Sequence, residues 1–191
     1  MLITRVITAF FLIIGISSAI LFLPEFWFAV IIFLATSLAC LELYSIVGVE
    51  RFVFRIACAF IYLFICLSVF LSGIDIVPLI YFSLALWLIA FLVVAYYPKG
   101  SSWLKNRVFA GFLGSLLLAG AAYSVVKIRG LDDGVLWLFW LFVLTTSVDA
   151  GGYFVGRKYG ERPLAARVSP GKTIEGLGGG LLFATLICGL L

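Results

Sequence analysis

Histidine is absent from this 191-residue chain, and charged residues make up only 12% of it. Without histidine, the chain cannot build a Ser-His or Cys-His nucleophile from its own residues. The charged share is about half that of an average soluble domain, whereas hydrophobic residues reach 65%. A soluble fold of this size needs a polar surface that such a composition cannot supply. The sequence therefore predicts an integral membrane protein.

Cysteine is also scarce, and its positions exclude the usual cysteine chemistry. The four cysteines all lie inside apolar runs, at Cys40, Cys58, Cys66 and Cys188. No pair has the spacing of metal ligands, and no histidine is present to complete a zinc site. We expect small buried apolar residues rather than disulfides or ligands.

Long apolar runs fill most of the chain and predict an all-α, polytopic membrane protein with about seven transmembrane helices. Lipid offers the backbone no hydrogen-bond partners, so segments that cross it are expected to be helical. The expected spans are 6–23, 26–47, 53–72, 77–96, 108–126, 134–156 and 174–191. The first is too long for the apolar part of a signal peptide and has no small-x-small cleavage site before Pro24, so we expect it to be retained.

The distribution of Lys and Arg predicts that the N-terminus is cytoplasmic. Of 13 such residues, all but Lys127 and Arg129 lie at the N-terminus or in the second, fourth and sixth loops and their flanks. The positive-inside rule places those segments, including the basic loop 157–173, on the cytoplasmic side of a membrane, which we expect to be the bacterial inner membrane. The net charge of +4 is then a topology signal, and no nucleic-acid partner is expected.

The most polar part of the chain runs from Thr145 to Gly180. Asp149 lies eight residues before Arg157, which is about 12 Å along a continuous helix. A carboxylate at that depth in lipid is costly and usually has a partner or a task. Two interpretations stay open, a functional group and a structural ion pair with an arginine of the sixth loop.

The sixth loop itself is unusually basic, with five cations in the sixteen residues from Arg157 to Lys172. Topology alone accounts for some basic residues in a cytoplasmic loop. These cations are interleaved with glycine and proline rather than placed on one helix face. Such a loop at a membrane surface suits the phosphate groups of a nucleotide or of a lipid head.

The stretch Ser169–Gly176 contains Gly-Lys-Thr, the end of a phosphate-binding P-loop. A P-loop also needs a glycine at position 166, where this chain has Ala166, so we exclude that motif. We predict instead that Ser169 is the N-cap of the last helix, with Pro170 in its first position. A helix N-terminus that also offers a Lys and a Thr is itself an anion site.

Two motifs in this region resemble a known family. They are Asp149-x-Gly-x-Tyr-Phe-x-Gly-Arg157 and Ser169-Pro-x-Lys-Thr-x-Glu-Gly176, joined by a short basic link. Together they resemble the phosphatidate cytidylyltransferases, also called CDP-diacylglycerol synthases. The resemblance implies transfer of a cytidylyl group from CTP to phosphatidate, which gives CDP-diacylglycerol and pyrophosphate with Mg²⁺ in phospholipid biosynthesis. By position, it implies that Arg157, Ser169, Lys172 and Thr173 bind substrate phosphate and that Asp149 helps to hold metal or orders a cation.

The chain departs from the family pattern in one respect. The family's most diagnostic motif, with a histidine and acidic metal ligands, follows further along and is absent here. We therefore expect residues 1–133 to hold about five N-terminal spans, and 134–191 to be the start of a catalytic region whose acids lie beyond Leu191. The 191-residue chain alone is expected to have little or no activity.

Other functions stay open at this point. One is a non-catalytic membrane protein or subunit that binds lipid phosphate. Another is a small transporter with Asp149 and Glu42 as intramembrane carriers. Glycines spaced by four, at Gly152 and Gly156 and at Gly176 and Gly180, allow close helix packing, and a homodimer is compatible with them.

Overall fold

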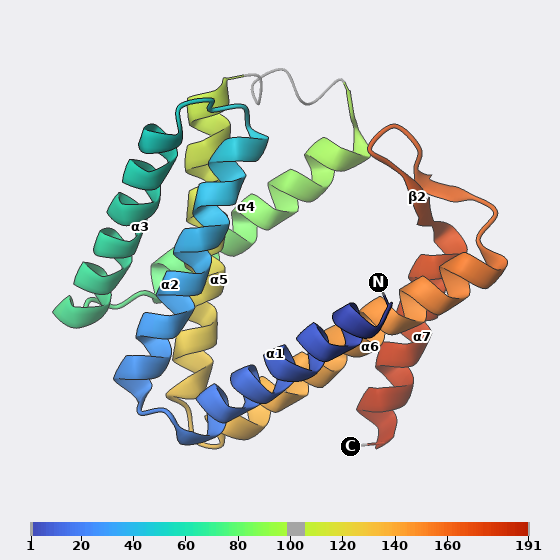
Figure 1. The fold of residues 1–191 in the computed structure, drawn as a ribbon. Coiled ribbons are helices and arrows are strands. Elements are labelled where there is room, and N and C mark those ends of the chain that lie inside the picture. Colours follow the sequence, from blue (N-terminus) through green and yellow to red (C-terminus); the bar gives the residue numbers. More distant parts are fainter. Residues whose placement is uncertain (1, 99–105, 191) are drawn as a thin grey trace. The chain divides into compact units, whose positions relative to one another are not determined.

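The computed structural model describes residues 2–98 and 106–190, and these are largely helical (Figure 1). The elements are α1 (Leu2–Phe22), α2 (Glu25–Ile46), α3 (Phe52–Ser72), α4 (Val77–Ala95), α5 (Arg107–Arg129), α6 (Gly134–Tyr159), β1 (Pro163–Ala165), β2 (Ser169–Thr173) and α7 (Ile174–Leu190). The expected helical architecture is confirmed, with one addition. A two-stranded hairpin lies within the basic loop, where only loop was expected.

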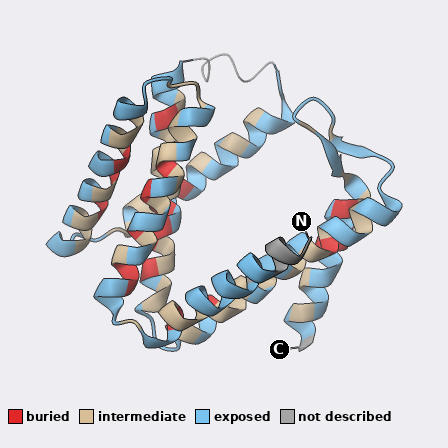
Figure 2. Cartoon of the chain, viewed as in Figure 1, coloured by how far each residue is buried: buried red, intermediate tan, exposed pale blue. Residues whose placement is uncertain are grey.

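Within the described residues, the five helices α2 to α6 are long and apolar enough to cross a membrane. About twenty residues of helix span the roughly 30 Å of hydrocarbon in a bilayer. Two further apolar helical stretches, Phe10–Phe22 and Ile174–Gly189, are shorter. Exposed residues run along the helices (Figure 2). Large apolar side chains are among them, for example Phe60, Phe64 and Phe91. These features support a polytopic membrane protein, while seven spans and the orientation stay predictions.

The chain divides into two compact units, Met1–Ile89 with Trp103–Val135 and Ala90–Ser102 with Leu136–Leu191. In the first unit, α2 packs against both α3 and α5 around buried Phe33. The ring of Phe33 meets that of Tyr123 edge to face, with centroids 5.0 Å apart. The Tyr123 hydroxyl donates to the Cys66 carbonyl at 2.6 Å, so this buried polar group is satisfied.

Glycines of α5 let the first unit pack closely. A Cβ built at Gly111 would lie 2.5 Å from Cε1 of Tyr44, on α2. One at Gly120 would overlap the Ser83 side chain of α4. Such close approach is usual where helices associate without a hydrophobic driving force between them. All four cysteines are free, and Cys40 and Cys66 are buried as expected, whereas Cys188 is exposed.

The second unit contains α6 from Leu136 onward, the hairpin and α7. The strands pair antiparallel, with Pro163 opposite Thr173 and Ala165 opposite Ser169. The turn is closed by the Val168 N–H, which donates to the Ala165 carbonyl at 3.0 Å. This pairing satisfies backbone groups in a segment where proline and glycine disfavour a helix.

The predicted start of the last helix at Ser169 is therefore wrong. Ser169–Thr173 is a strand, and α7 begins at Ile174. Thr173 takes the capping role, because its Oγ1 accepts from the Gly176 N–H at 3.1 Å. That bond satisfies one of the free amides at the first turn of α7.

Candidate functional site

Glycines bring α6 and α7 close together in the second unit. A Cβ built at Gly176 would lie 3.0 Å from the Gly152 carbonyl oxygen, and one at Gly179 would lie 2.8 Å from the Gly151 carbonyl oxygen. Side chains at these positions would force the helices apart. The glycine pattern seen in the sequence therefore serves packing within this chain.

A cavity of about 550 Å³ opens between these helices and the hairpin. It is lined by Val148, Asp149, Gly152, Tyr153, Gly156, Arg157, Leu164, Gly171, Lys172, Thr173, Gly176, Leu177 and Gly180. Its wall combines glycine backbone, apolar side chains and a few charged groups. That combination is typical of sites for small ligands.

Four of the five predicted site residues line this cavity. Asp149 and Arg157 come from α6, and Lys172 and Thr173 come from β2. Residues four apart share one face of a helix. Asp149, Tyr153 and Arg157 follow one another at this interval on α6, and all three line the cavity. The hairpin returns the chain so that Lys172 and Thr173 face them. Ser169 is not among the lining residues, and its contact with phosphate stays a prediction.

The cationic side chains of the cavity, Arg157 and Lys172, have N–H donors that a ligand could use. Arg157 donates through Nη1 to the Tyr153 hydroxyl at 2.7 Å, and its guanidinium carbon lies 5.8 Å from the centroid of that ring. A guanidinium has five N–H donors, so this contact orients Arg157 and leaves others. In the described part of the chain, no ion pair joins Asp149 to an arginine of the loop. Both interpretations of Asp149, as a functional group and as a structural partner of an arginine, stay predictions.

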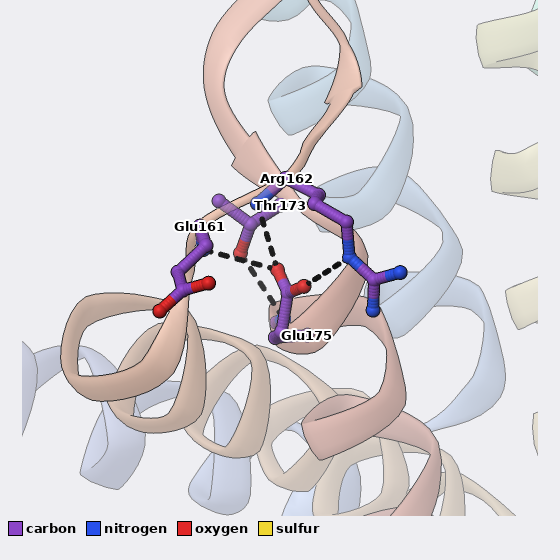
Figure 3. A network of polar contacts seen from close by, with 5 residues as sticks. Glu161, Arg162, Thr173 and Glu175 are labelled. Carbon is purple, nitrogen blue, oxygen red and sulfur yellow. Dashed lines mark hydrogen bonds and ion pairs between the residues drawn. The ribbon is translucent and has the colours of Figure 1, made fainter.

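The base of the hairpin is fixed by a carboxylate (Figure 3). Glu175 accepts from Nε of Arg162 at 2.8 Å through Oε1, and from the backbone N–H groups of Glu161 and Arg162 at 3.2 Å each through Oε2. The Arg162 hydrogen bond, helped by the Glu175 backbone N–H, lowers the pKa of Glu175 to about 2. We missed this network from the sequence. The one feature of the sequence that could have indicated this network is an acidic residue, Glu175, in the first turn of the helix after Thr173.

The cavity offers one carboxylate as a ligand for a divalent metal ion. Asp149 is the acidic residue among the lining side chains, and the described residues contain no group of three His, Cys, Asp or Glu placed to hold a metal. Mg²⁺ often uses one or two carboxylates and completes its shell with substrate phosphates and water. Asp149 therefore fits as a single ligand of such an ion.

Comparison with known proteins identifies the family. Residues 3–191 match the sequence model described as the Cytidylyltransferase family. The chain belongs to this family. A phosphatidate cytidylyltransferase of Haemophilus influenzae is 36% identical over 109 residues, which cover 53% of this chain and 38% of the relative. That of Pseudomonas aeruginosa is 31% identical over 187 residues, or 95% of this chain and 67% of the relative.

A third relative, the phosphatidate cytidylyltransferase of Bacillus subtilis, is 36% identical over 76 residues, or 39% of this chain and 28% of the relative. The match therefore spans between about a quarter and two thirds of the length of these relatives. No solved structure matches the chain. The predicted resemblance to phosphatidate cytidylyltransferases is confirmed at the level of the family.

Proposed function

We propose that the second unit supplies a phosphate-binding part of a cytidylyltransferase site that acts on CTP and phosphatidate. One observation leads to this proposal: the cavity has Arg157 and Asp149 on one wall and Lys172 and Thr173 on another. Facing cations and a hydroxyl suit the oxygens of a phosphate or of a phosphate chain. Family membership supports the choice of nucleotide and reaction.

In this reaction, a phosphate oxygen of phosphatidate attacks the α-phosphorus of CTP. The bond between the α-phosphorus and the bridging oxygen breaks, and pyrophosphate leaves. Arg157 and Lys172 would hold and neutralise the phosphate oxygens, since such transfers depend mainly on positioning and electrostatics. Thr173 already accepts from the Gly176 N–H, and its hydroxyl hydrogen remains for a phosphate oxygen. Mg²⁺, with Asp149 as one ligand, would supply further charge neutralisation when bound.

The membrane location and orientation form part of the same proposal. CTP is a cytoplasmic nucleotide, and the basic loop 157–173 is predicted to be cytoplasmic by its Lys and Arg content. A lipid phosphate lies at the membrane surface, where this loop would meet it. We place the chain in the inner membrane of a bacterium on these grounds.

Binding of CTP to the chain in lipid nanodiscs, with and without phosphatidate, tests the proposal. Lys172→Gln should weaken CTP binding about tenfold, because a hydrogen bond to a charged group contributes about 1.5–3 kcal/mol and this side chain is exposed. Arg167→Gln is the matched control. It makes the same charge change in the same hairpin, at a residue that does not line the cavity. Equal affinities for the two variants would refute the assignment of Lys172.

A second candidate function is non-catalytic binding of lipid phosphate. The observation that favours it is the single carboxylate of the cavity, since the described residues hold no cluster of three metal ligands. Phosphatidate binding without CTP binding would select this alternative. A homodimer remains a hypothesis, and its test is the mass of the detergent-solubilised particle.

A further inference from the structure

Both carboxylate oxygens of Glu175 already have partners from the segment that enters the hairpin. Oε1 takes the Arg162 Nε–H, and Oε2 takes the backbone N–H groups of Glu161 and Arg162. The Ile174 N–H adds a bond in the other direction, to the Arg162 carbonyl at 2.9 Å. Figure 3 shows the Glu175 side chain between these donors, at the point where the two ends of the hairpin meet.

The hairpin depends on contacts of this kind for its position. Its strands have three and five residues, and an isolated two-stranded hairpin is marginally stable in water. Lys172 and Thr173 belong to its second strand, directly before α7. Thr173 also lies close to α6, since a Cβ built at Gly156 would be 3.2 Å from Thr173 Oγ1. The Glu175 contacts tie the end of this strand to Glu161 and Arg162. Glu175 follows Thr173 by two residues and Lys172 by three.

We propose that Glu175 is a positioning residue that closes the base of the hairpin and so holds Lys172 and Thr173 at the cavity wall. This inference rests on the proposed phosphate-binding function of that cavity. It gives an acidic residue beside the site a role different from metal binding. The arrangement acts through backbone amides as well as through the Arg162 ion pair, so the charge of Arg162 is only part of it.

The contacts of Glu175 argue against a role as metal ligand. Its side chain is 20% exposed, and it is not among the residues that line the cavity. A metal ion at Oε2 would have to displace two backbone amides, and one at Oε1 would lie beside the cationic guanidinium of Arg162. Those amides would then lose their partner, and unsatisfied backbone donors are costly.

The test compares Glu175→Gln with Glu161→Gln in the full chain in nanodiscs. Both variants remove one negative charge from a residue at the base of the hairpin, but only the Glu175 carboxylate accepts the hydrogen bonds of the network. Glu161 contributes its backbone N–H to this network, and that group survives the substitution. Two measurements are made on each variant, hydrogen exchange of the amides of residues 161, 162 and 174, and CTP affinity as a function of Mg²⁺ concentration. Arg162→Gln is a second variant, which removes the ion pair and keeps the backbone bonds.

We expect Glu175→Gln to speed amide exchange and to lower CTP affinity roughly tenfold, as expected when a charged hydrogen-bond acceptor is lost. The Mg²⁺ concentration for half-maximal binding should not change. Arg162→Gln should show a smaller effect of the same kind, and Glu161→Gln should match the unmodified chain.

Each contrary result has a distinct meaning. A shift in the Mg²⁺ requirement with unchanged exchange would make Glu175 a metal ligand and overturn the inference. Faster exchange with unchanged CTP affinity would show that the contact is structural only, which also overturns it. Absence of CTP binding by the unmodified chain would refute the proposed function itself, and the role of Glu175 with it.

Discussion

The close contact between α6 and α7 should be sensitive to a single methyl group at Gly179. A Cβ at this position would overlap the Val155 side chain and lie 2.8 Å from the Gly151 carbonyl oxygen. Gly178, next to it on α7, has nothing within 4 Å of a built Cβ. Gly179→Ala and Gly178→Ala therefore make the same chemical change on one helix, and only the first meets the other helix.

The expected difference in stability follows from comparing these two variants. Alanine is favoured over glycine within a helix by about 1 kcal/mol, and both variants gain this amount. Overpacking of a tight contact costs about 1–3 kcal/mol, and only Gly179→Ala incurs it. The helix propensities cancel in the comparison, so Gly179→Ala should be less stable than Gly178→Ala by about 1–3 kcal/mol.

Thermal unfolding in detergent, followed by circular dichroism, measures this difference. For a chain of about 190 residues, 1 kcal/mol shifts Tm by roughly 2–4 °C, so the two variants should differ by at least roughly 2 °C. The cavity lies between the same helices, so CTP affinity should fall in Gly179→Ala as well. Equal Tm values for the two variants would refute the close packing of α6 against α7 at this point.

The remaining predictions concern the polar groups of the site. Tyr153→Phe removes the acceptor 2.7 Å from Arg157 and keeps the ring, so CTP affinity should fall about twofold to fivefold; a loss as large as that in Arg157→Gln would contradict this. Because the pKa of Glu175 is lowered from 4.5 to about 2, its contribution to the hairpin is complete above pH 4.5 and is lost as pH falls towards 2. Amide exchange at Arg162, corrected for its intrinsic pH dependence, should follow that decline, and full protection at pH 2 would disprove it. Finally, the 191-residue polypeptide should release little or no pyrophosphate from CTP, phosphatidate and Mg²⁺, since one carboxylate lines the cavity; measurable turnover would refute this.

The helical membrane class could be predicted from composition because lipid leaves the backbone few alternatives. The predicted start of the third span at residue 53 agrees with helix α3, Phe52–Ser72, since turn residues mark its ends. Local sequence patterns predicted secondary structure less reliably where a segment could form either a helix start or a strand. Ser169-Pro170 is typical of a helix start, yet pairing with β1 makes this segment a strand and moves the cap to Thr173.

By itself, the sequence determined the class of the protein, its approximate helices and four residues that prove to line one cavity. Hydropathy and short motifs are local properties of the sequence, so they can be recognised without knowing how the chain folds. Only the tertiary structure decided that Lys172 faces Arg157, that glycines of α6 and α7 meet, and that Glu175 holds the base of the hairpin. Each of these arrangements brings together residues 13 or more positions apart, and their geometry depends on how the backbone turns between them. No spacing rule along the chain contains that information.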